Sequence, residues 1–164
     1  MSSDREQQVL AALAALGLAY AKRDHPPAAT VEEAVGYWQG IPGAHCKNLF
    51  LRNKKGNHHY LVIAEHRRPI DLKALAKILP DDRLSFASDE RLARHLGVTP
   101  GAVSPFGLIN DEARAVVVIV DEGLREAAFV SFHPNVNTST VTISWAAFQA
   151  FLAWRGNPVR TVRF

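Results

Sequence analysis

Five segments of the chain carry apolar residues at the spacing of an α-helix, each beside a residue that favours a helix end. The first helix is expected over residues 4–17, where Gly17 is a natural C-terminal stop. Polar residues that can cap a helix N-terminus begin the other segments, and Thr30 with Glu33 forms a capping box. The pattern therefore predicts further helices over residues 30–39, 71–80, 88–97 and 144–156.

Short runs of β-branched and aromatic residues predict strands between these helices. Residues 48–53 and 59–64 flank the sequence Lys-Lys-Gly-Asn, which is typical of a hairpin turn. Residues 115–120 form the most apolar run of the chain, so we expect this strand at the centre of the sheet. Further strands are expected over residues 83–88, 126–134 and 139–144.

The order of these elements decides the fold class. Hairpins are mixed with helical excursions, so a strict alternation of strand and helix is excluded. We expect an α/β fold of the mixed (α+β) kind, with a central mixed, largely antiparallel β-sheet of six to seven strands surrounded by about five helices. A chain of 164 residues is long enough for one ordinary domain, which we expect to span residues 1–164.

Composition and charge narrow the class of protein. Apolar residues make up 48% of the chain and charged residues 21%, which is typical of a globular protein. No apolar run reaches the length that crosses a membrane, and the N-terminus lacks the pattern of a signal peptide. The single cysteine, Cys46, cannot form an internal disulfide, so we expect a cytoplasmic protein. A net charge of +3 tolerates a polyanionic partner such as RNA but does not demand one.

Lys47 stands at the entrance of an apolar strand, in the sequence Lys-Asn-Leu-Phe-Leu. In one interpretation its aliphatic stem covers apolar surface while its ammonium group reaches water. In the other, the ammonium group faces a pocket, where it would hold a carbonyl or phosphate oxygen and stabilise developing negative charge. The residue alone does not decide between the two.

Two polar loops are further candidates for a site. The loop over residues 97–107 is rich in glycine and proline but lacks the Gly-Lys-Ser/Thr end of a phosphate-binding loop. It is either an ordinary turn or a rigid backbone wall that can approach a ligand closely. The loop over residues 133–138 is a plausible turn, but a turn explains Pro134 and Asn135 better than it explains His133.

The remaining histidines and the cysteine suggest no nucleophile or metal site. His45 and Cys46 are neighbours in an extended segment, so their side chains should point to opposite faces of the strand. His58 and His59 are expected at the surface of the hairpin, and no further metal ligands are evident near them. The segment His66-Arg67-Arg68 is the densest basic patch, which is either a solvated loop or a phosphate contact.

The order of these motifs, rather than any one of them, is specific. Lys47 at the start of its strand is followed by Gly-x-x-x-Pro at Gly101 to Pro105, by Val-Val-Val-Ile-Val-Asp, and by His-Pro-Asn-Val-Asn-Thr from His133. From about Asp24 to Trp154 the chain resembles the YbaK/prolyl-tRNA synthetase-associated editing domain family. The Lys-Asn pair and the His-Pro-Asn-x-Asn-Thr run resemble the free-standing deacylases that clear alanine mischarged onto tRNA(Pro).

The resemblance implies an enzyme that hydrolyses the ester of a mischarged Ala-tRNA(Pro) in trans. Water would attack the ester with help from a ribose hydroxyl of the substrate, without a metal, a cofactor or an enzyme nucleophile. Lys47 and His133 would be the catalytic residues. Alanine would be selected by size, since a pocket that admits alanine can exclude proline. The residues expected to bind the substrate are Asn48, Gly101, Ala102, Val103, Ser104, Pro105 and Phe106, with Tyr20, Ile41 and Phe50 as candidates for the selectivity pocket.

The partner implied by the resemblance is the acceptor end of tRNA(Pro), with prolyl-tRNA synthetase or an elongation factor as further candidates. The expected protein is a monomer that does not bind a membrane. Three alternatives remain at this point. The chain could deacylate another mischarged tRNA such as Cys-tRNA(Pro), could bind nucleic acid without catalysis, or could be a structural domain of a larger synthetase.

Overall fold

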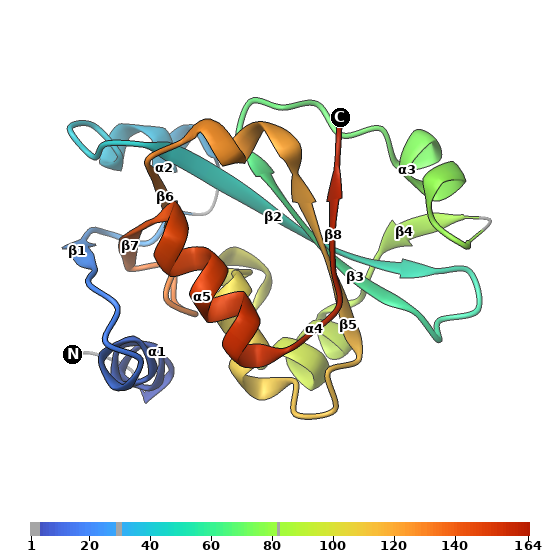
Figure 1. The fold of residues 1–164 in the computed structure, drawn as a ribbon, viewed down its shortest axis with the longest axis horizontal. Coiled ribbons are helices and arrows are strands. Elements are labelled where there is room, and N and C mark those ends of the chain that lie inside the picture. Colours follow the sequence, from blue (N-terminus) through green and yellow to red (C-terminus); the bar gives the residue numbers. More distant parts are fainter. Residues whose placement is uncertain (1–3, 29–30, 82) are drawn as a thin grey trace.

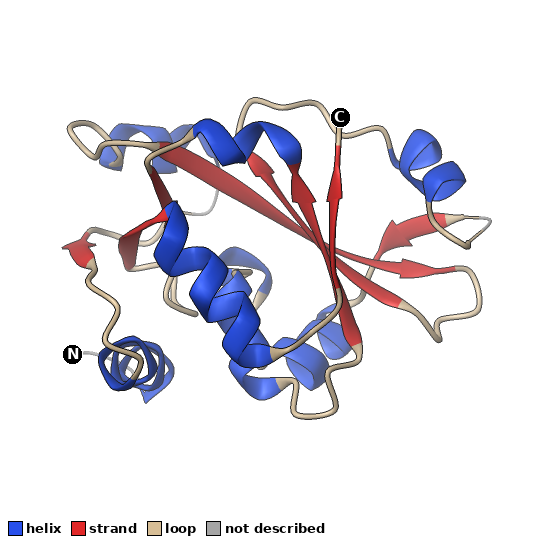
Figure 2. Cartoon of the chain, in the orientation of Figure 1, coloured by secondary structure: helices blue, strands red, loops and turns tan. Residues whose placement is uncertain are grey.

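The computed structural model describes residues 4–28, 31–81 and 83–164. Within these residues the chain forms five α-helices, three short 3-10 helices and eight strands (Figures 1 and 2). The α-helices are α1 (Asp4–Ala15), α2 (Val31–Tyr37), α3 (Leu72–Ile78), α4 (Asp89–Leu96) and α5 (Trp145–Arg155). The 3-10 helices are η1 (Pro100–Ala102), η2 (Pro105–Asn110) and η3 (Glu122–Glu126).

Side chains at the expected positions cap three of the helices. Asp71 accepts hydrogen bonds from the amides of the first turn of α3, Ser88 accepts one from the Arg91 amide, and Ser144 accepts one from the Ala147 amide. Gly97 ends α4 in the left-handed conformation, as expected, with a φ of 66°. The structure begins α2 at residue 31, and the predicted cap Thr30 lies outside the described residues.

The described strands form one mixed sheet in the order β1-β7-β6-β2-β3-β5-β8, with β4 paired to β2. Their bounds are β1 Ala21–Asp24, β2 Ala44–Asn53, β3 His59–Glu65, β4 Leu84–Phe86, β5 Val116–Asp121, β6 Phe129–Phe132, β7 Ser139–Ser144 and β8 Val159–Val162. Among the described strands, four pairings are antiparallel and three are parallel. The α/β class is thereby confirmed, and the parallel pairs are more numerous than expected.

Two sequence predictions about the sheet are corrected. The described chain has eight strands instead of six or seven, because the short strands β1 and β8 were not predicted. Strand β5 is not central, since it lies between β3 and β8 towards one end of the sheet. Its apolar sequence has another cause: Val118 and Val120 face one core cluster, whereas Ile119 faces the other.

Strand β2 is the long element that joins the two halves of the sheet (Figure 1). Its first residues pair with β6, and its later residues pair with β3 and β4. Because alternate side chains of a strand point to opposite faces, Cys46 and Phe50 enter the larger core, whereas Leu49 and Leu51 enter the smaller one. We call the face that carries Leu49 and Leu51 the second face of the sheet.

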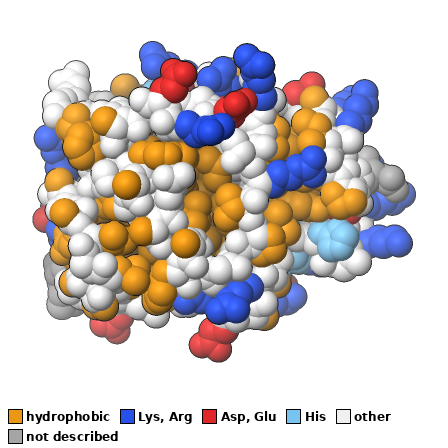
Figure 3. Space-filling view, in the orientation of Figure 1, with side chains coloured by type: hydrophobic (Ala, Val, Ile, Leu, Met, Phe, Trp, Pro, Cys, Tyr) orange, Lys and Arg blue, Asp and Glu red, His pale blue; other side chains and the backbone are white. Residues whose placement is uncertain are grey.

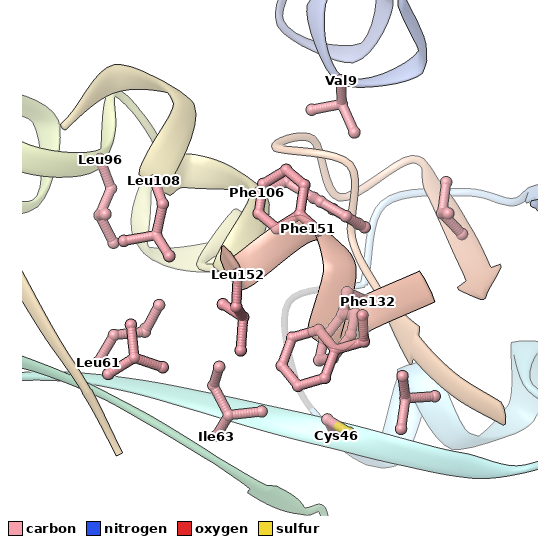
Figure 4. Close-up of a cluster of buried hydrophobic side chains, with 14 of the residues drawn as sticks. Val9, Cys46, Leu61, Ile63, Leu96, Phe106, Leu108, Phe132, Phe151 and Leu152 are labelled. Atoms are coloured by element: carbon pink, nitrogen blue, oxygen red, sulfur yellow. The ribbon is translucent and has the colours of Figure 1, made fainter. Parts of the chain in front are cut away.

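The larger core lies between the first face of the sheet and helices α1, α4 and α5. Figure 4 shows Phe106, Phe132 and Phe151 together above β2, with Val9 of α1 at the edge of the cluster. The Phe106 ring lies edge-on to the rings of Phe132 and Phe151, with centroid distances of 5.8 and 5.2 Å. The smaller core packs α3 against the second face. No helix of the described chain is both long enough and apolar enough to cross a membrane.

His59 corrects a prediction about the hairpin. His58 is exposed, as expected, but His59 is 6% exposed and lies between Phe50 and His95, with ring centroid distances of 5.7 and 4.1 Å. Arg91 Nη1 lies 3.0 Å from His59 Nε2, which fits a neutral imidazole that accepts this hydrogen bond. Burial lowers the pKa of His59 to about 4, with the neighbouring His95 and arginines as further causes.

Candidate active site

Strand alternation places Lys47 on the second face of the sheet, together with His45 and Leu49. His45 is opposite Ser131 in the parallel pairing of β2 with β6. His133 directly follows β6, and Lys47 follows His45 by two residues. Both residues that the sequence analysis predicts to be catalytic therefore lie just beyond the paired segment of β2 and β6.

Lys47 is partly buried. Within the described chain it has neither a carboxylate within ion-pair distance nor a hydrogen-bond partner. Some other basic side chains are paired: Lys22 lies 3.1 Å from Asp24, and Arg68 lies 3.2 Å from the buried Asp121. The ammonium group of Lys47 is therefore not engaged by a carboxylate and is available to an anionic or strongly polar ligand.

His133 is held in one orientation by the turn that contains it. Its Nδ1 lies 2.9 Å from the Ser139 carbonyl oxygen, so Nδ1 donates and Nε2 carries the lone pair of the neutral ring. Burial lowers the pKa of His133, which the hydrogen bond to Ser139 opposes and the nearby His25 reinforces. The imidazole is thus neutral at pH 7 and can accept a proton or a hydrogen bond at Nε2.

His25 connects this histidine to helix α2, and the sequence analysis did not single it out. Its ring stacks on Tyr37 at the end of α2, with centroids 5.1 Å apart and planes 6° apart. Its Nε2 lies 2.9 Å from Thr140 Oγ1, and its ring centroid lies 5.9 Å from that of His133. The sequence around His25, which precedes two prolines, does not indicate this role. The contacts of His25 with Thr140 and His133 exist only because β1 pairs with β7.

The loop that follows α2 packs on His45, two residues before Lys47. The Trp38 indole stacks on the His45 ring at a centroid distance of 4.5 Å, and His45 Nε2 lies 3.3 Å from the Ile41 carbonyl oxygen. His45 Nδ1 is buried without a partner among the described residues. Burial lowers the pKa of His45, so this ring is also neutral.

Asn135 ties the loop of residues 133–138 to the glycine-proline loop, and Asn137 lies close to Gly101. Asn135 Nδ2 donates to the Phe106 carbonyl oxygen at 3.3 Å, and a side chain at Gly101 would meet Asn137 Nδ2 at 3.3 Å. Asn135 adopts a φ of 62°, a conformation that asparagine tolerates better than most residues. The run His-Pro-Asn-Val-Asn-Thr therefore joins two loops that lie about thirty residues apart in the sequence.

Some residues of the predicted substrate-binding loop are buried or hydrogen-bonded within the protein, whereas others are exposed and can contact a ligand. Ser104 and Phe106 are fully buried, and Ser104 Oγ caps η2 by accepting from the Phe106 amide. The Ala102 amide donates to the Thr99 carbonyl oxygen, so it is also engaged. Pro105 is buried as the first residue of η2, whereas Gly101 is exposed and Val103 is partly exposed. The candidates to contact a ligand are therefore Gly101 and Val103.

Asn48, next to Lys47, points to the opposite face of β2. Its Oδ1 is buried without a hydrogen-bond partner among the described residues, on the side that also holds Cys46 and Phe50. A buried unpaired amide oxygen is costly, and such atoms are rare in folded proteins. Asn48 therefore has an unfilled hydrogen-bonding capacity near the start of the apolar strand.

A cavity of about 700 Å³ lies beside this site, at the edge formed by β1, β7 and the start of α5. Tyr20 and Ile41, two of the three predicted selectivity residues, line it together with Phe129, Thr140 and Thr142. The third, Phe50, is 4% exposed and lies in the core instead. Figure 3 shows many hydrophobic side chains across the left and middle of this side of the molecule, while lysines and arginines gather mainly along its upper edge and right end.

The remaining candidates offer little chemistry. Cys46 is buried in the core, and burial raises the pKa of its thiol far above the usual range, so it is not a nucleophile. Each member of the basic patch 66–68 has a carboxylate partner: His66 and Arg67 contact Glu65, and Arg68 contacts Asp121. Among the described residues, no three histidine, cysteine, aspartate or glutamate side chains are grouped to hold a metal ion.

Comparison with known proteins identifies the family. The model of the aminoacyl-tRNA editing domain matches residues 25–151. The prolyl-tRNA editing protein ProX of Acetoanaerobium sticklandii is 40% identical over 162 residues, which cover 99% of each chain. The prolyl-tRNA synthetase associated domain-containing protein 1 of Xenopus laevis is 33% identical and covers 100% of this chain and 99% of its own length.

Solved structures support the fold. The crystal structure of a proposed trans-editing enzyme for prolyl-tRNA synthetase superposes with a TM-score of 0.72, at 20% identity, over 100% of this chain and 99% of the other. A likeness at this level of identity concerns the fold alone. The family match and the full-length relatives carry the assignment: the chain belongs to the aminoacyl-tRNA editing domain family, and it is an aminoacyl-tRNA deacylase, a hydrolase that cleaves an ester bond.

Proposed function

We propose that this protein hydrolyses Ala-tRNA(Pro) in trans, and that the whole chain, residues 1–164, acts as one editing domain. The name of the 40% identical relative supports prolyl-tRNA editing. The alanine preference rests on the Lys47-Asn48 pair and on the run that begins at His133. The observation that carries the proposed site is Lys47, a partly buried cation without an acidic partner in the described chain, just beyond the β2–β6 pair that His133 also follows.

The proposed reaction uses water as the nucleophile. Water adds to the ester carbonyl carbon, and its proton passes to the neighbouring ribose hydroxyl oxygen of the terminal adenosine, which hands its own hydrogen to the esterified ribose oxygen. The bond between that carbon and the esterified ribose oxygen then breaks, which leaves free alanine and an uncharged tRNA end. Lys47 would bind the carbonyl oxygen and stabilise the negative charge that develops on it, an interaction that is stronger in a partly dry site.

The other residues of the site would position the substrate. The neutral His133 can accept a hydrogen bond from a ribose hydroxyl or from the attacking water at Nε2. Gly101 and Val103, on the loop that Asn135 contacts through the Phe106 carbonyl oxygen, would contact the terminal nucleotide. Selection by size is needed because a synthetase site gains only about 1–3 kcal/mol against an amino acid that lacks one methylene group.

Single-turnover hydrolysis of Ala-tRNA(Pro), with Pro-tRNA(Pro), Cys-tRNA(Pro) and Ala-tRNA(Ala) as controls, tests the substrate. We expect release of alanine from tRNA(Pro) and little release from the three controls. Faster cleavage of Cys-tRNA(Pro) than of Ala-tRNA(Pro) would overturn the alanine assignment. Equal cleavage of Ala-tRNA(Ala) would overturn the dependence on tRNA(Pro).

The role of Lys47 is tested in the same assay. Lys47→Ala should lower the rate by about 10²- to 10³-fold, the usual effect of removing a group that stabilises an oxyanion. Lys73→Ala, which removes an exposed lysine of α3, is the matched control and should keep the wild-type rate. Full activity of a folded Lys47→Ala protein would contradict the proposed role.

A strong chelator should leave the rate of hydrolysis unchanged. A loss of activity that added zinc restores would contradict the mechanism without metal.

A further inference from the structure

The cavity beside the candidate site is too large for the group that the enzyme is proposed to select. Its volume of about 700 Å³ lies within the range of about 300–1,000 Å³ that is usual for sites of much larger ligands. A cavity that excludes proline but admits alanine has to match a methyl group closely. The cavity therefore has room for more of the substrate than the side chain of alanine.

The walls of the cavity carry partly exposed aromatic rings. Tyr20 is 40% exposed and Phe129 is 41% exposed. Thr140, Thr142 and Ser144 of β7 also line the cavity, but their hydroxyl groups already bond to His25, Ser131 and the Ala147 amide. The exposed aromatic rings suit the flat face of a nucleobase.

One cation at the cavity keeps its charge. Arg23 Nη1 lies 2.5 Å from the Gln39 carbonyl oxygen and 3.4 Å from that of Tyr37, and it has no carboxylate partner among the described residues. Because carbonyl groups carry no net charge, the guanidinium remains a positive group at the cavity wall. Lys22, also at the wall, shares its charge with Glu6 and Asp24. Arg23 is therefore the group at the cavity wall that can contact a phosphate of a phosphodiester.

A single loop borders both the cavity and the face of Lys47. Residues 40–42 line the cavity, while the carbonyl oxygen of Ile41 accepts a hydrogen bond from His45, two residues before Lys47. The strands are shared as well: Thr142 lines the cavity and its Oγ1 lies 2.8 Å from Ser131 Oγ, and Ser131 is opposite His45. A ligand in the cavity is thus next to the candidate catalytic face. The cavity lies on the side of β2 where β6, β7 and β1 follow in the sheet.

We infer that this cavity binds the unpaired nucleotides that precede the terminal adenosine of the tRNA, with Tyr20 and Phe129 as stacking platforms and Arg23 beside a phosphate. The inference rests on the proposed function, because it needs a substrate that is esterified at the 3′ end of an RNA. It assigns Tyr20 to the RNA instead of the amino acid, and it explains how an enzyme with a small selectivity pocket gains affinity for a long substrate.

Two substrates of different length separate this subsite from the catalytic site. Single-turnover rates are measured over a range of enzyme concentrations with Ala-tRNA(Pro) and with alanyl-adenosine, which has the ester but lacks the preceding nucleotides. Tyr20→Leu and Phe129→Leu keep apolar volume but remove the ring. We expect each to lower the second-order rate constant for Ala-tRNA(Pro) by about 5- to 150-fold, the range for loss of one base–aromatic stack, and to leave that for alanyl-adenosine unchanged.

Two further variants serve as controls. Tyr20→Phe keeps the ring and should restore most of the rate on Ala-tRNA(Pro) that Tyr20→Leu loses. Trp154→Leu removes a ring that is 42% exposed but lies outside the cavity, so it should also have no effect. Equal losses on the two substrates, or no loss on either, would overturn the subsite. If Phe129→Leu does not fold, as judged by its thermal unfolding, the rates of Tyr20→Leu on the two substrates alone test the subsite.

Direct binding distinguishes a failure of the subsite from a failure of the proposed function. Fluorescence anisotropy measures the affinity for an uncharged RNA pentamer that ends in C-C-A and carries a 5′ dye. We expect weaker binding by Tyr20→Leu and unchanged binding by Lys73→Ala. If wild-type protein binds this RNA through Tyr20 but cleaves no alanyl ester, the result supports the nucleotide subsite and contradicts the proposed substrate. Absence of binding at millimolar RNA, or binding that is independent of Tyr20 and Phe129, overturns the subsite.

Discussion

At the scale of single residues, the candidate site is defined by which polar groups lack partners. Lys47 has no acidic neighbour in the described chain, and the Asn48 side-chain oxygen and His45 Nδ1 are buried without hydrogen bonds there. Unpaired polar atoms of this kind are destabilising, and they persist in functional sites where a ligand or water completes them. His45 and Lys47 lie on the second face of β2, where the candidate site is, whereas Asn48 points to the opposite face.

His25 is the residue whose role we expect to be positional. His25→Ala removes the stack on Tyr37 and the hydrogen bond to Thr140, which together hold α2 and the surroundings of His133. We expect a loss of about 10-fold or more in the rate at saturating enzyme, since small misplacements of reacting groups are costly. Single-turnover kinetics measures this loss, and His25→Gln, which can still bond to Thr140, should restore part of it.

The pH dependence of the rate distinguishes this role from a loss of stability. Proximity of His25 lowers the pKa of His133, so His25→Ala should raise that pKa. If neutral His133 is the active form, the acidic limb of the rate profile will move to higher pH. A variant that is slower at every pH but keeps the position of its acidic limb would show that His25 supports the fold only.

At the scale of elements, the loop after α2 is held by a close backbone contact. A side chain at Gly43 would lie 2.3 Å from the Phe129 carbonyl oxygen, and Gly43 has a φ of 91°. Gly43→Ala should therefore displace the loop and lower the free energy of unfolding by about 1–3 kcal/mol. Denaturant unfolding measures the change. Gly36→Ala in α2, where no atom lies within 4 Å, is the control and should be neutral or stabilising.

Helix ends, which depend on residues close in the sequence, could be predicted from the sequence. Contacts between elements that are distant in the sequence could not. Asp71, Ser88 and Ser144 cap their helices as predicted, because capping depends on residues only three positions away. The position of β5 was predicted wrongly because an apolar strand near one end of the sheet, covered on both faces, reads like a central one. The role of His25 depends on a pairing across more than a hundred residues, which no local pattern encodes.

At the scale of the whole molecule, buried neutral histidines make stability depend on pH. Burial is the largest cause of a lowered pKa at His45, His59, His95 and His133. For each, the unfolded chain binds a proton more readily than the folded chain does below the ordinary histidine pKa of about 6.5. Their contribution is therefore constant above that pH, and the folded state loses stability as the pH falls below it.

His59 should account for a measurable share of this acid sensitivity. Its pKa of about 4 in the folded state predicts a loss of about 3 kcal/mol in the free energy of unfolding between pH 7 and pH 4. Protonation would also set a cation against Arg91, which now donates to His59 Nε2. Thermal unfolding of wild type and His59→Gln between pH 7 and pH 4 measures the difference. We expect His59→Gln to be less stable at pH 7 but to lose less stability on acidification, whereas exposed His58→Gln should follow the wild-type curve. Parallel curves for wild type and His59→Gln would show that the acid sensitivity has another source.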